Sequence, residues 1–214
     1  MSDHLVFDRT LLDRRRQRAL GGEVADFLLR AVADDLIDRL GAVKRRFPLA
    51  ADIGSPLPLV ADRLVAGGQV GRVVRLDRLA DALADRRHVA VAGDEEILPF
   101  GAGTLDLAVS VLALQFANDL PGALVQIRRA LKADGLLLAA LLGGETLTEL
   151  RQSLAIAEAE LTGGAAPRVA PFAELRTAGS LLQRAGFALP VIDQDRLTVR
   201  YGDALSLMRD LRAM

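Results

Sequence analysis

The sequence contains no cysteine, no tryptophan and only two histidines, His4 and His88. The lack of cysteine excludes disulfides, thiolate metal sites and cysteine nucleophiles. Two histidines are too few for a histidine-rich metal centre, and a two-histidine iron site would require both of them to meet. We therefore expect no metal site.

A large excess of charge and a long apolar run are also absent. The formal net charge of −1 argues against nucleic-acid binding, which usually requires basic residues in excess on one face. We interpret the clusters Arg14-Arg15-Arg16 and Lys44-Arg45-Arg46 as solvated helix faces. No apolar stretch reaches the ~18 residues of a membrane span, and the charged N-terminus lacks the apolar core of a secretory signal. These features predict a cytoplasmic protein without a membrane span.

The pattern of apolar residues predicts an α/β protein. Strand and helix signals alternate from about residue 48 to about residue 143, which is typical of a parallel sheet with helical connections. Before this region, Val24, Leu28, Val32, Leu36 and Leu40 recur every four residues and predict a helix that ends near Gly41. We therefore expect an N-terminal helical extension at residues 1–47 and a Rossmann-like domain at residues 48–214.

The predicted sheet has parallel strands at 49–53, 73–76, 88–92, 105–114 and 136–142. The long apolar run 105–114 is expected to be the central strand, buried on both faces. Two further strands, 187–192 and 196–201, are expected to form an antiparallel pair after the parallel ones. Helices are predicted at 59–65, 79–83, from 120 to 131, 147–161 and 172–186.

A candidate ligand site follows the first two strands. The first strand ends in Asp52-Ile53-Gly54, and the second ends in Asp77, which is followed by Arg78. A turn of this kind holds the polar tail of a nucleotide-type ligand, while the acid after the next strand accepts hydrogen bonds from ribose hydroxyls. The spacing alone does not distinguish an NAD site from an S-adenosylmethionine site.

Three further polar residues are expected at the same edge of the sheet. Asp94 and Glu95 lie just past the third strand and Ser110 lies near the end of the fourth. In an open α/β sheet, ligands bind beyond the carboxyl ends of the strands. Structural roles remain alternatives: Asp77 as the polar end of a strand, Asp52 as a cap for loop N–H groups, and Asp94 and Glu95 as surface acids.

The loop after Gly54 is unusual. A glycine-rich segment is expected there, but the sequence reads Ser55-Pro56-Leu57-Pro58. Glycine allows the backbone to approach a ligand and donate N–H groups, whereas proline has no N–H and adds bulk. The Ser55 hydroxyl could replace one donor, but Pro56 and Pro58 place cofactor binding in doubt.

Residues 94–100 (DEEILPF), 104–110 (TLDLAVS) and 131–135 (LKADG) resemble the body of a class I S-adenosylmethionine-dependent methyltransferase. This resemblance implies a seven-stranded sheet, a bound S-adenosylmethionine, and contact between Asp94 and the adenine amino group. More specific similarity, to the methyltransferase-like assembly factors of respiratory complex I and more distantly to the carrier-protein methyltransferases of biotin synthesis, is carried by residues 7–9, 118–121, 143–151, 171–172, 185–187 and 207–211.

Two functions follow from these resemblances. The first is methyl transfer from S-adenosylmethionine to a protein or to a carrier-bound acyl group. The second is a catalytically degenerate complex I assembly factor that acts as a binding module or modifies an arginine of a subunit; Gln115-Phe116, where relatives often have His-Trp, favours degeneracy. Arginine hydroxylation would need an oxygen-activating centre, for which the sequence offers no convincing ligand set. Val60, Leu64 and the first helix could supply an exposed apolar patch for self-association as a homodimer.

Overall fold

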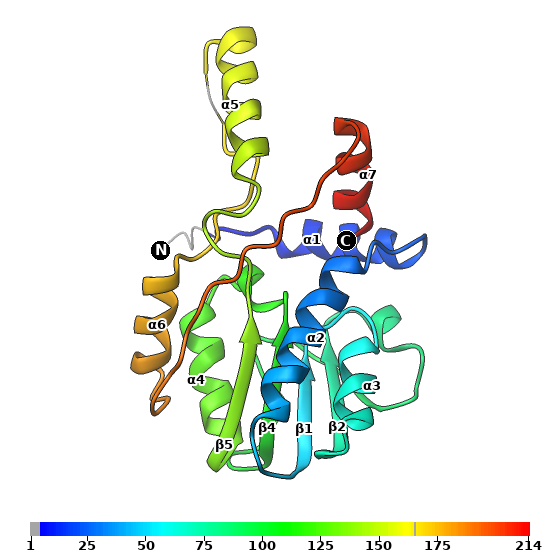
Figure 1. Ribbon diagram of the computed structural model, residues 1–214, viewed down its shortest axis with the longest axis vertical. Helices are drawn as coiled ribbons and strands as arrows, with labels where there is room; N and C mark the ends of the chain where they lie inside the picture. The colour runs from blue at the N-terminus through cyan, green and yellow to red at the C-terminus, as the bar shows by residue number, and fades with distance from the viewer. Residues whose placement is uncertain (1–4, 165) are drawn as a thin grey trace.

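The computed structural model describes residues 5–164 and 166–214. One of the two histidines, His4, lies outside the described residues. Its centre is one sheet with helices on both faces, and all strands run toward the edge that lies uppermost in Figure 1. The five strands are β1 (Phe47–Ile53), β2 (Val70–Asp77), β3 (Val89–Ala92), β4 (Leu105–Val111) and β5 (Leu131–Ala140).

The strand order is β3-β2-β1-β4-β5, and every pairing is parallel. The central strand is therefore β1, not the 105–114 run that the sequence predicted for this position, although every residue of β4 is buried. The chain winds outward from β1 to β3 and then crosses back to β4. This reversal beside β1 is the position at which doubly wound sheets bind ligands.

Helices α2 (Phe27–Gly41) and α3 (Leu59–Ala66) cover one face of the sheet, and α4 (Leu120–Ala130) covers the other. The first core includes Leu36, Leu40 and Leu64, and the second includes Ile127. Apolar residues spaced three or four apart form the buried stripe of each helix. Short 3-10 helices η1 (Ala80–Leu83) and η2 (Leu114–Phe116) follow β2 and β4.

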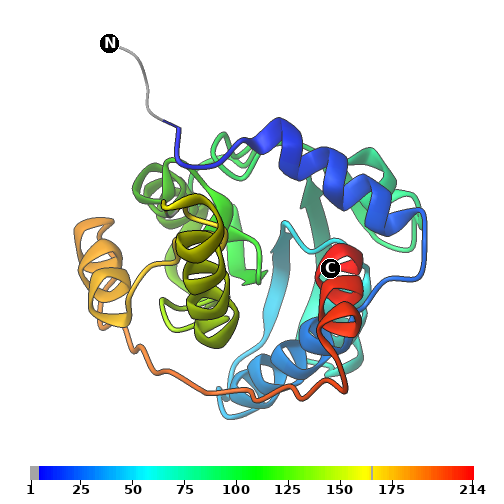
Figure 2. The same cartoon turned by 90° about the horizontal axis from the view of Figure 1, so that it is seen from above.

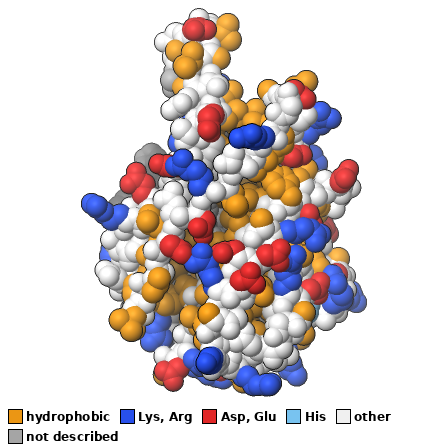
Figure 3. Space-filling view, viewed as in Figure 1, with side chains coloured by type: hydrophobic (Ala, Val, Ile, Leu, Met, Phe, Trp, Pro, Cys, Tyr) orange, Lys and Arg blue, Asp and Glu red, His pale blue; other side chains and the backbone are white. Residues whose placement is uncertain are grey.

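Four more helices lie at the periphery. Helix α1 (Arg9–Leu20) crosses above the carboxyl edge of the sheet, as the view from above shows (Figure 2). Helix α5 (Thr148–Thr162) projects away from that edge, and none of its residues is buried. Helix α6 (Leu175–Arg184) packs beside α4, and α7 (Ala204–Ala213) packs against α1. Figure 3 shows hydrophobic side chains gathered between α5 and α7.

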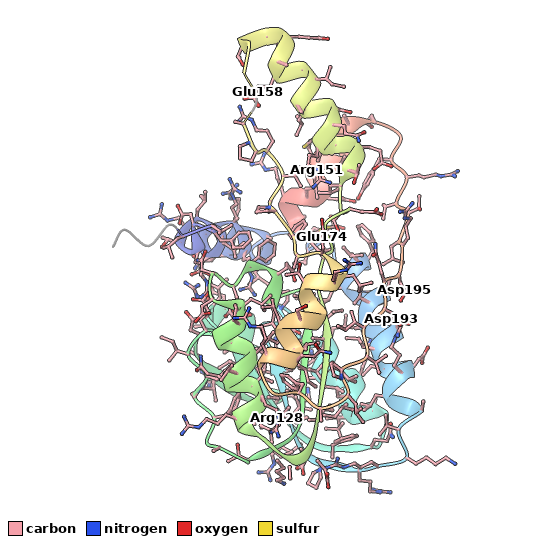
Figure 4. The ribbon with its side chains drawn as sticks, turned by 90° about the vertical axis from the view of Figure 1, so that its left-hand side faces the viewer. Arg128, Arg151, Glu158, Glu174, Asp193 and Asp195 are labelled. Carbon is pink, nitrogen blue, oxygen red and sulfur yellow. The ribbon has the colours of Figure 1, made fainter. Side chains whose placement is uncertain are left out.

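The predicted antiparallel C-terminal pair is wrong, and the described residues form five strands where seven were expected. Segment 187–203 is extended but pairs with no strand. Arg39 of α2 bonds to Asp193 and, at 2.8 Å, to Asp195, which lie beside α2 in Figure 4. Pro190 has no N–H for a ladder. The segment is thus held by side chains on α2 and not by the free edge of β5.

Two residues of the predicted self-association patch are buried, so this part of the prediction is wrong. Val60 and Leu64 are each 1% exposed and lie in the core between α3 and the sheet, so neither can contact a second copy. Among the described residues, no helix combines the length and the apolar character needed to cross a membrane.

Candidate functional site

The turn after β1 requires glycine. Gly54 has a φ of +81°, in the left-handed region, and a Cβ at this position would lie 2.6 Å from the Cβ of Ala113. Its N–H donates to the carbonyl oxygen of Leu76 on β2 at 2.8 Å. The turn is therefore close to the carboxyl end of both neighbouring strands, and no larger residue fits there without displacement.

Asp52 and Ser55 form a buried pair beneath this turn. The Ser55 hydroxyl donates to Oδ1 of Asp52 at 2.5 Å, and both residues are almost fully buried. The other carboxylate oxygen of Asp52 is buried and has no hydrogen-bond partner among the described residues. Burial raises the pKa of Asp52 to about 7, against the hydrogen bond from Ser55 and the charge of Arg75.

Arg75 is the largest fully buried side chain and lies under the altered loop. Its Nη2 donates to the carbonyl oxygen of Ser55 at 3.1 Å, and its Nη1 bonds to Asp85, also at 3.1 Å. Its Nε lies 3.8 Å from Oδ2 of Asp52. An arginine within a buried strand is unusual enough that the sequence alone could have identified it as part of a polar network.

Asp77 ends β2 and Arg78 follows it, and each bonds to α1. Oδ1 of Asp77 accepts from the N–H of Leu79 at 2.8 Å, and Oδ2 accepts from Nη2 of Arg16 at 2.6 Å. The Asp77 side chain is completely inaccessible to solvent. Arg78 donates to Asp13 at 2.7 Å. The acid predicted to bind ribose is therefore already occupied by a protein side chain.

Asp94 and Glu95 lie in a tight turn after β3 and share one cation. Nη1 of Arg9 is 2.9 Å from Asp94 and from Glu96, and Nη2 bonds to Glu95. Burial raises the pKa of Glu95, and the charge of Arg9 opposes this shift. Glu95, which one alternative treated as a surface acid, is only 8% exposed.

Ser110 has a structural contact in this conformation. It is fully buried on β4, and its hydroxyl donates to the carbonyl oxygen of Ile53 at 3.0 Å, which joins β4 to the end of β1. Farther along, the ring of Phe116 meets Phe7 and Phe172 edge to face, at centroid distances of 5.8 and 6.1 Å. Gln115 donates to the carbonyl oxygen of Leu112 at 2.8 Å.

The eight predicted residues therefore gather at one edge of the sheet, but α1 was not predicted to meet them. Its residues Arg9, Asp13 and Arg16 lie on one face because they are four and three positions apart. Arg14 and Arg15 are exposed, as predicted, whereas Arg16 is not a solvated surface residue. Charges at helical spacing, opposite in sign to those of the site, were the available signal.

A hollow in the surface lies next to the predicted residues without including them. A pocket of about 390 Å³ opens beside the proline loop, with Gln17 of α1 on one side and Pro56, Pro58 and Asp81 on the others. None of the eight predicted site residues lines this pocket. The space next to Asp77 is instead filled by Arg16, whose Nη2 also lies 3.4 Å from the carbonyl oxygen of Gly54.

Comparisons with known proteins identify the family of this chain. Residues 52–139 match the protein family described as "Methyltransferase domain". This segment runs from the buried acid at the end of β1 to the end of β5, and so it contains all eight predicted site residues.

Two groups of characterised proteins are similar along nearly the whole chain. The mitochondrial arginine-hydroxylase NDUFAF5 of Danio rerio is 40% identical over 98% of this chain and 67% of its own length, and that of Homo sapiens is 39% identical over 98% and 63%. The chain thus spans about two thirds of these relatives. The malonyl-[acyl-carrier protein] O-methyltransferase of Methylovorus sp. (strain MP688) is 33% identical over 100% of this chain and 75% of its own length.

Solved structures share the fold at lower identity. An S-adenosylmethionine-dependent methyltransferase from Mesorhizobium loti has a TM-score of 0.58 at 18% identity, covering 91% of this chain and 93% of that one. A chain in a methyltransferase–activator complex from Haloferax volcanii has a TM-score of 0.63 at 20% identity, covering 83% and 75%. These structures share the fold, and the sequence relatives show that the chain belongs to the class I S-adenosylmethionine-dependent methyltransferase family.

Proposed function

We propose that this protein binds S-adenosylmethionine at the carboxyl edge of β1, β2 and β3 and transfers its methyl group to a protein or to a carrier-bound acyl group. The observation that carries the proposal is the position of the left-handed Gly54 turn beside Asp77. The turn is joined to β2 through Leu76, the residue immediately before Asp77. The turn therefore lies next to the acid that we propose binds the ribose, which supports a cofactor at this edge.

The residues at this edge have the hydrogen-bond acceptors that such a cofactor needs. Asp77 has acceptors suited to ribose hydroxyls, and Asp94 and Glu95 have acceptors suited to an adenine amino group, although residues of α1 bond to all three in this conformation. The unpartnered oxygen of Asp52 is a buried acceptor suited to a donor group on the ligand or in the loop. Ser55 and Arg75 hold the loop, so Pro56 and Pro58 need not donate N–H groups to keep its shape.

Bound S-adenosylmethionine supplies an electrophilic methyl group. Transfer therefore depends on in-line positioning and exclusion of water more than on a strong base. Phe7, Phe116 and Phe172 lie beyond the end of β4 and would provide an apolar wall on the acceptor side.

Methyl transfer is favoured over hydroxylation for this chain. Within residues 5–164 and 166–214, no three histidine, cysteine, aspartate or glutamate side chains are arranged to hold a metal ion. Iron-dependent oxygen chemistry usually uses two histidines and a carboxylate, and this sequence has two histidines in total.

A second function is favoured by the altered loop. Pro56 and Pro58 remove two N–H groups from the cofactor turn, and Asp77 is buried against Arg16. These features suit a degenerate methyltransferase that acts as a binding module, as the resemblance to complex I assembly factors suggests. Under this proposal Asp77→Ala would leave the cellular role intact.

Calorimetric titration of the full chain with S-adenosylmethionine and S-adenosylhomocysteine tests the two functions. Methyl transfer requires binding, and micromolar affinity corresponds to about 8 kcal/mol. Asp77→Ala should abolish the heat, whereas Asp38→Ala, which removes an exposed acid from α2, should not change it. If neither ligand binds at millimolar concentration, the transferase proposal is wrong and the binding-module proposal is favoured.

A further inference from the structure

One face of α1 contacts every charged residue predicted to bind the ligand after β2 and β3. Arg16 bonds to Asp77, Asp13 to Arg78, and Arg9 to both Asp94 and Glu95. The three α1 residues are consecutive on a helical face, and their charges complement those of their partners. Helix α1 therefore recognises the same groups that a ligand would need.

The contact between Arg16 and Asp77 excludes a ligand from this carboxylate. Asp77 is entirely buried, and its two oxygens accept from Leu79 and from Arg16. The Arg16 guanidinium also reaches within 3.4 Å of the Gly54 carbonyl oxygen, so it lies between the turn and the acid. A ribose could bond to Asp77 only after Arg16 had moved.

Helix α1 is held to the sheet mainly by polar contacts. Ala19 is its only buried residue, so little apolar surface holds it in place. Gly21 and Gly22 connect it to the next segment, and glycine accepts a wide range of backbone angles. Besides the ionic contacts, α1 packs against α7 and its Gln17 bonds to Asp81 at 2.8 Å. Its position thus depends mainly on polar bonds.

We propose that α1 is a latch over the cofactor site and that Arg16 competes with the ligand for Asp77. This inference depends on the proposed function, because it concerns the regulation of that same site. The structure is the latched state. Ligand binding replaces the guanidinium on Asp77 with ribose hydroxyls and displaces α1 from the edge of the sheet. A group or partner that binds α1 away from the sheet would then raise cofactor affinity.

Removing the latch should strengthen ligand binding. We expect Arg16→Ala to bind S-adenosylhomocysteine about tenfold more tightly than the unmodified chain in calorimetry. Arg14→Ala is the matched control, because it removes the same charge from an exposed position on the same helix. Asp13→Asn weakens a different contact of α1, the one with Arg78, and leaves Arg16 and Asp77 unchanged. It should also raise the affinity.

Hydrogen exchange measured by mass spectrometry gives a readout that needs no ligand. The amides of residues 9–20 should exchange faster in Arg16→Ala and Asp13→Asn than in Arg14→Ala. In the unmodified chain, S-adenosylhomocysteine should also speed exchange in this segment while protecting the Gly54 turn. Ligands usually slow exchange where they bind, so faster exchange in α1 would be specific to displacement.

The outcomes separate the latch from the proposed function. Weaker or unchanged binding by Arg16→Ala would overturn the latch and, if weaker, assign Arg16 to the ligand contacts. Absence of binding in every variant would overturn the proposed function instead. The exchange rates would then decide whether Arg16 holds α1: faster exchange in Arg16→Ala than in Arg14→Ala supports the holding contact, and equal rates overturn it.

Discussion

Arg75 donates a hydrogen bond from Nη2 to the carbonyl oxygen of Ser55, 3.1 Å away, and so joins β2 to the proline-containing loop after β1. Both residues are buried. Pro56 and Pro58 have no N–H groups with which to hold the loop. The guanidinium of Arg75 holds it instead, through the Ser55 carbonyl oxygen.

Arg75→Met should therefore unfold more easily than the unmodified chain. It leaves the Ser55 carbonyl and the carboxylates of Asp52 and Asp85 without their buried cation, and breaking such a pair costs about 3 kcal/mol. Denaturant unfolding followed by circular dichroism measures the loss. Arg72→Met, on the exposed part of the same strand, should stay within about 0.5 kcal/mol of the unmodified chain. Equal losses of stability in the two variants would show that Arg75 does not stabilise the loop.

Gly54→Ala should destabilise the protein by about 2 kcal/mol. The left-handed φ costs about 1 kcal/mol with a side chain, and the new Cβ would clash with Ala113 at 2.6 Å. Adding Ala113→Gly relieves the clash but not the backbone strain, so the double variant should recover only part of the loss in thermal unfolding. Gly143→Ala is the control, because its Cβ meets nothing within 4 Å.

Asp52 makes folding stability depend on pH. Its pKa of about 7 in the folded state exceeds the ordinary value of 3.8, so the folded state keeps a proton that the unfolded state has lost. The stability from this group is complete below pH 3.8 and is lost as the pH rises to about 7. Asp52→Asn cannot titrate, so its stability relative to the unmodified chain should rise by about 3 kcal/mol between pH 5 and pH 8. Parallel curves from denaturant titrations at several pH values would contradict this expectation.

Asp106 joins three strands at the opposite end of the sheet. Its carboxylate accepts from the N–H of Leu49 at 3.0 Å and from Nζ of Lys132 at 2.8 Å. Burial by itself would raise the pKa of Asp106, but these two bonds together lower it. Asp106→Ala leaves the Leu49 N–H without an acceptor and should cost about 2 kcal/mol. Asp106→Asn keeps an acceptor and should cost less. Lys132→Ala should cost least, because the ammonium group is half-exposed. The reverse order in chemical denaturation would show that the ion pair dominates.

The sheet and the gathering of the site residues could be predicted from the sequence for a simple physical reason. Strands buried on both faces are continuous apolar runs, as β4 is, and parallel strands all end at one edge. Any polar residue at the end of such a run must therefore lie near the others. This reasoning alone predicts that Asp52, Asp77 and Asp94 lie near one another.

The docking of α1 and the path of segment 187–203 could not be predicted in this way. Helix α1 has no apolar stripe, and its position is set by side chains 61 or more residues away in the sequence. Segment 187–203 has the alternation of a strand, but Arg39 binds Asp193 and Asp195 and holds it elsewhere. In both places, ion pairs between distant residues decide the structure, and the periodicity of the apolar residues carries no record of them.

The distance along the chain between Arg16 and Asp77 has a consequence for synthesis. Sixty-one residues separate them, and eighty-six separate Arg9 from Glu95. At about 5–20 residues per second, the ribosome makes Asp77 roughly 3–12 s after Arg16. Helix α1 must wait for strands made later, and its single buried residue gives it no earlier anchor. The growing chain therefore carries α1 without its ionic partners until β2 and β3 have been made, so the guanidinium groups of Arg9 and Arg16 meet solvent before they meet the acids of the site.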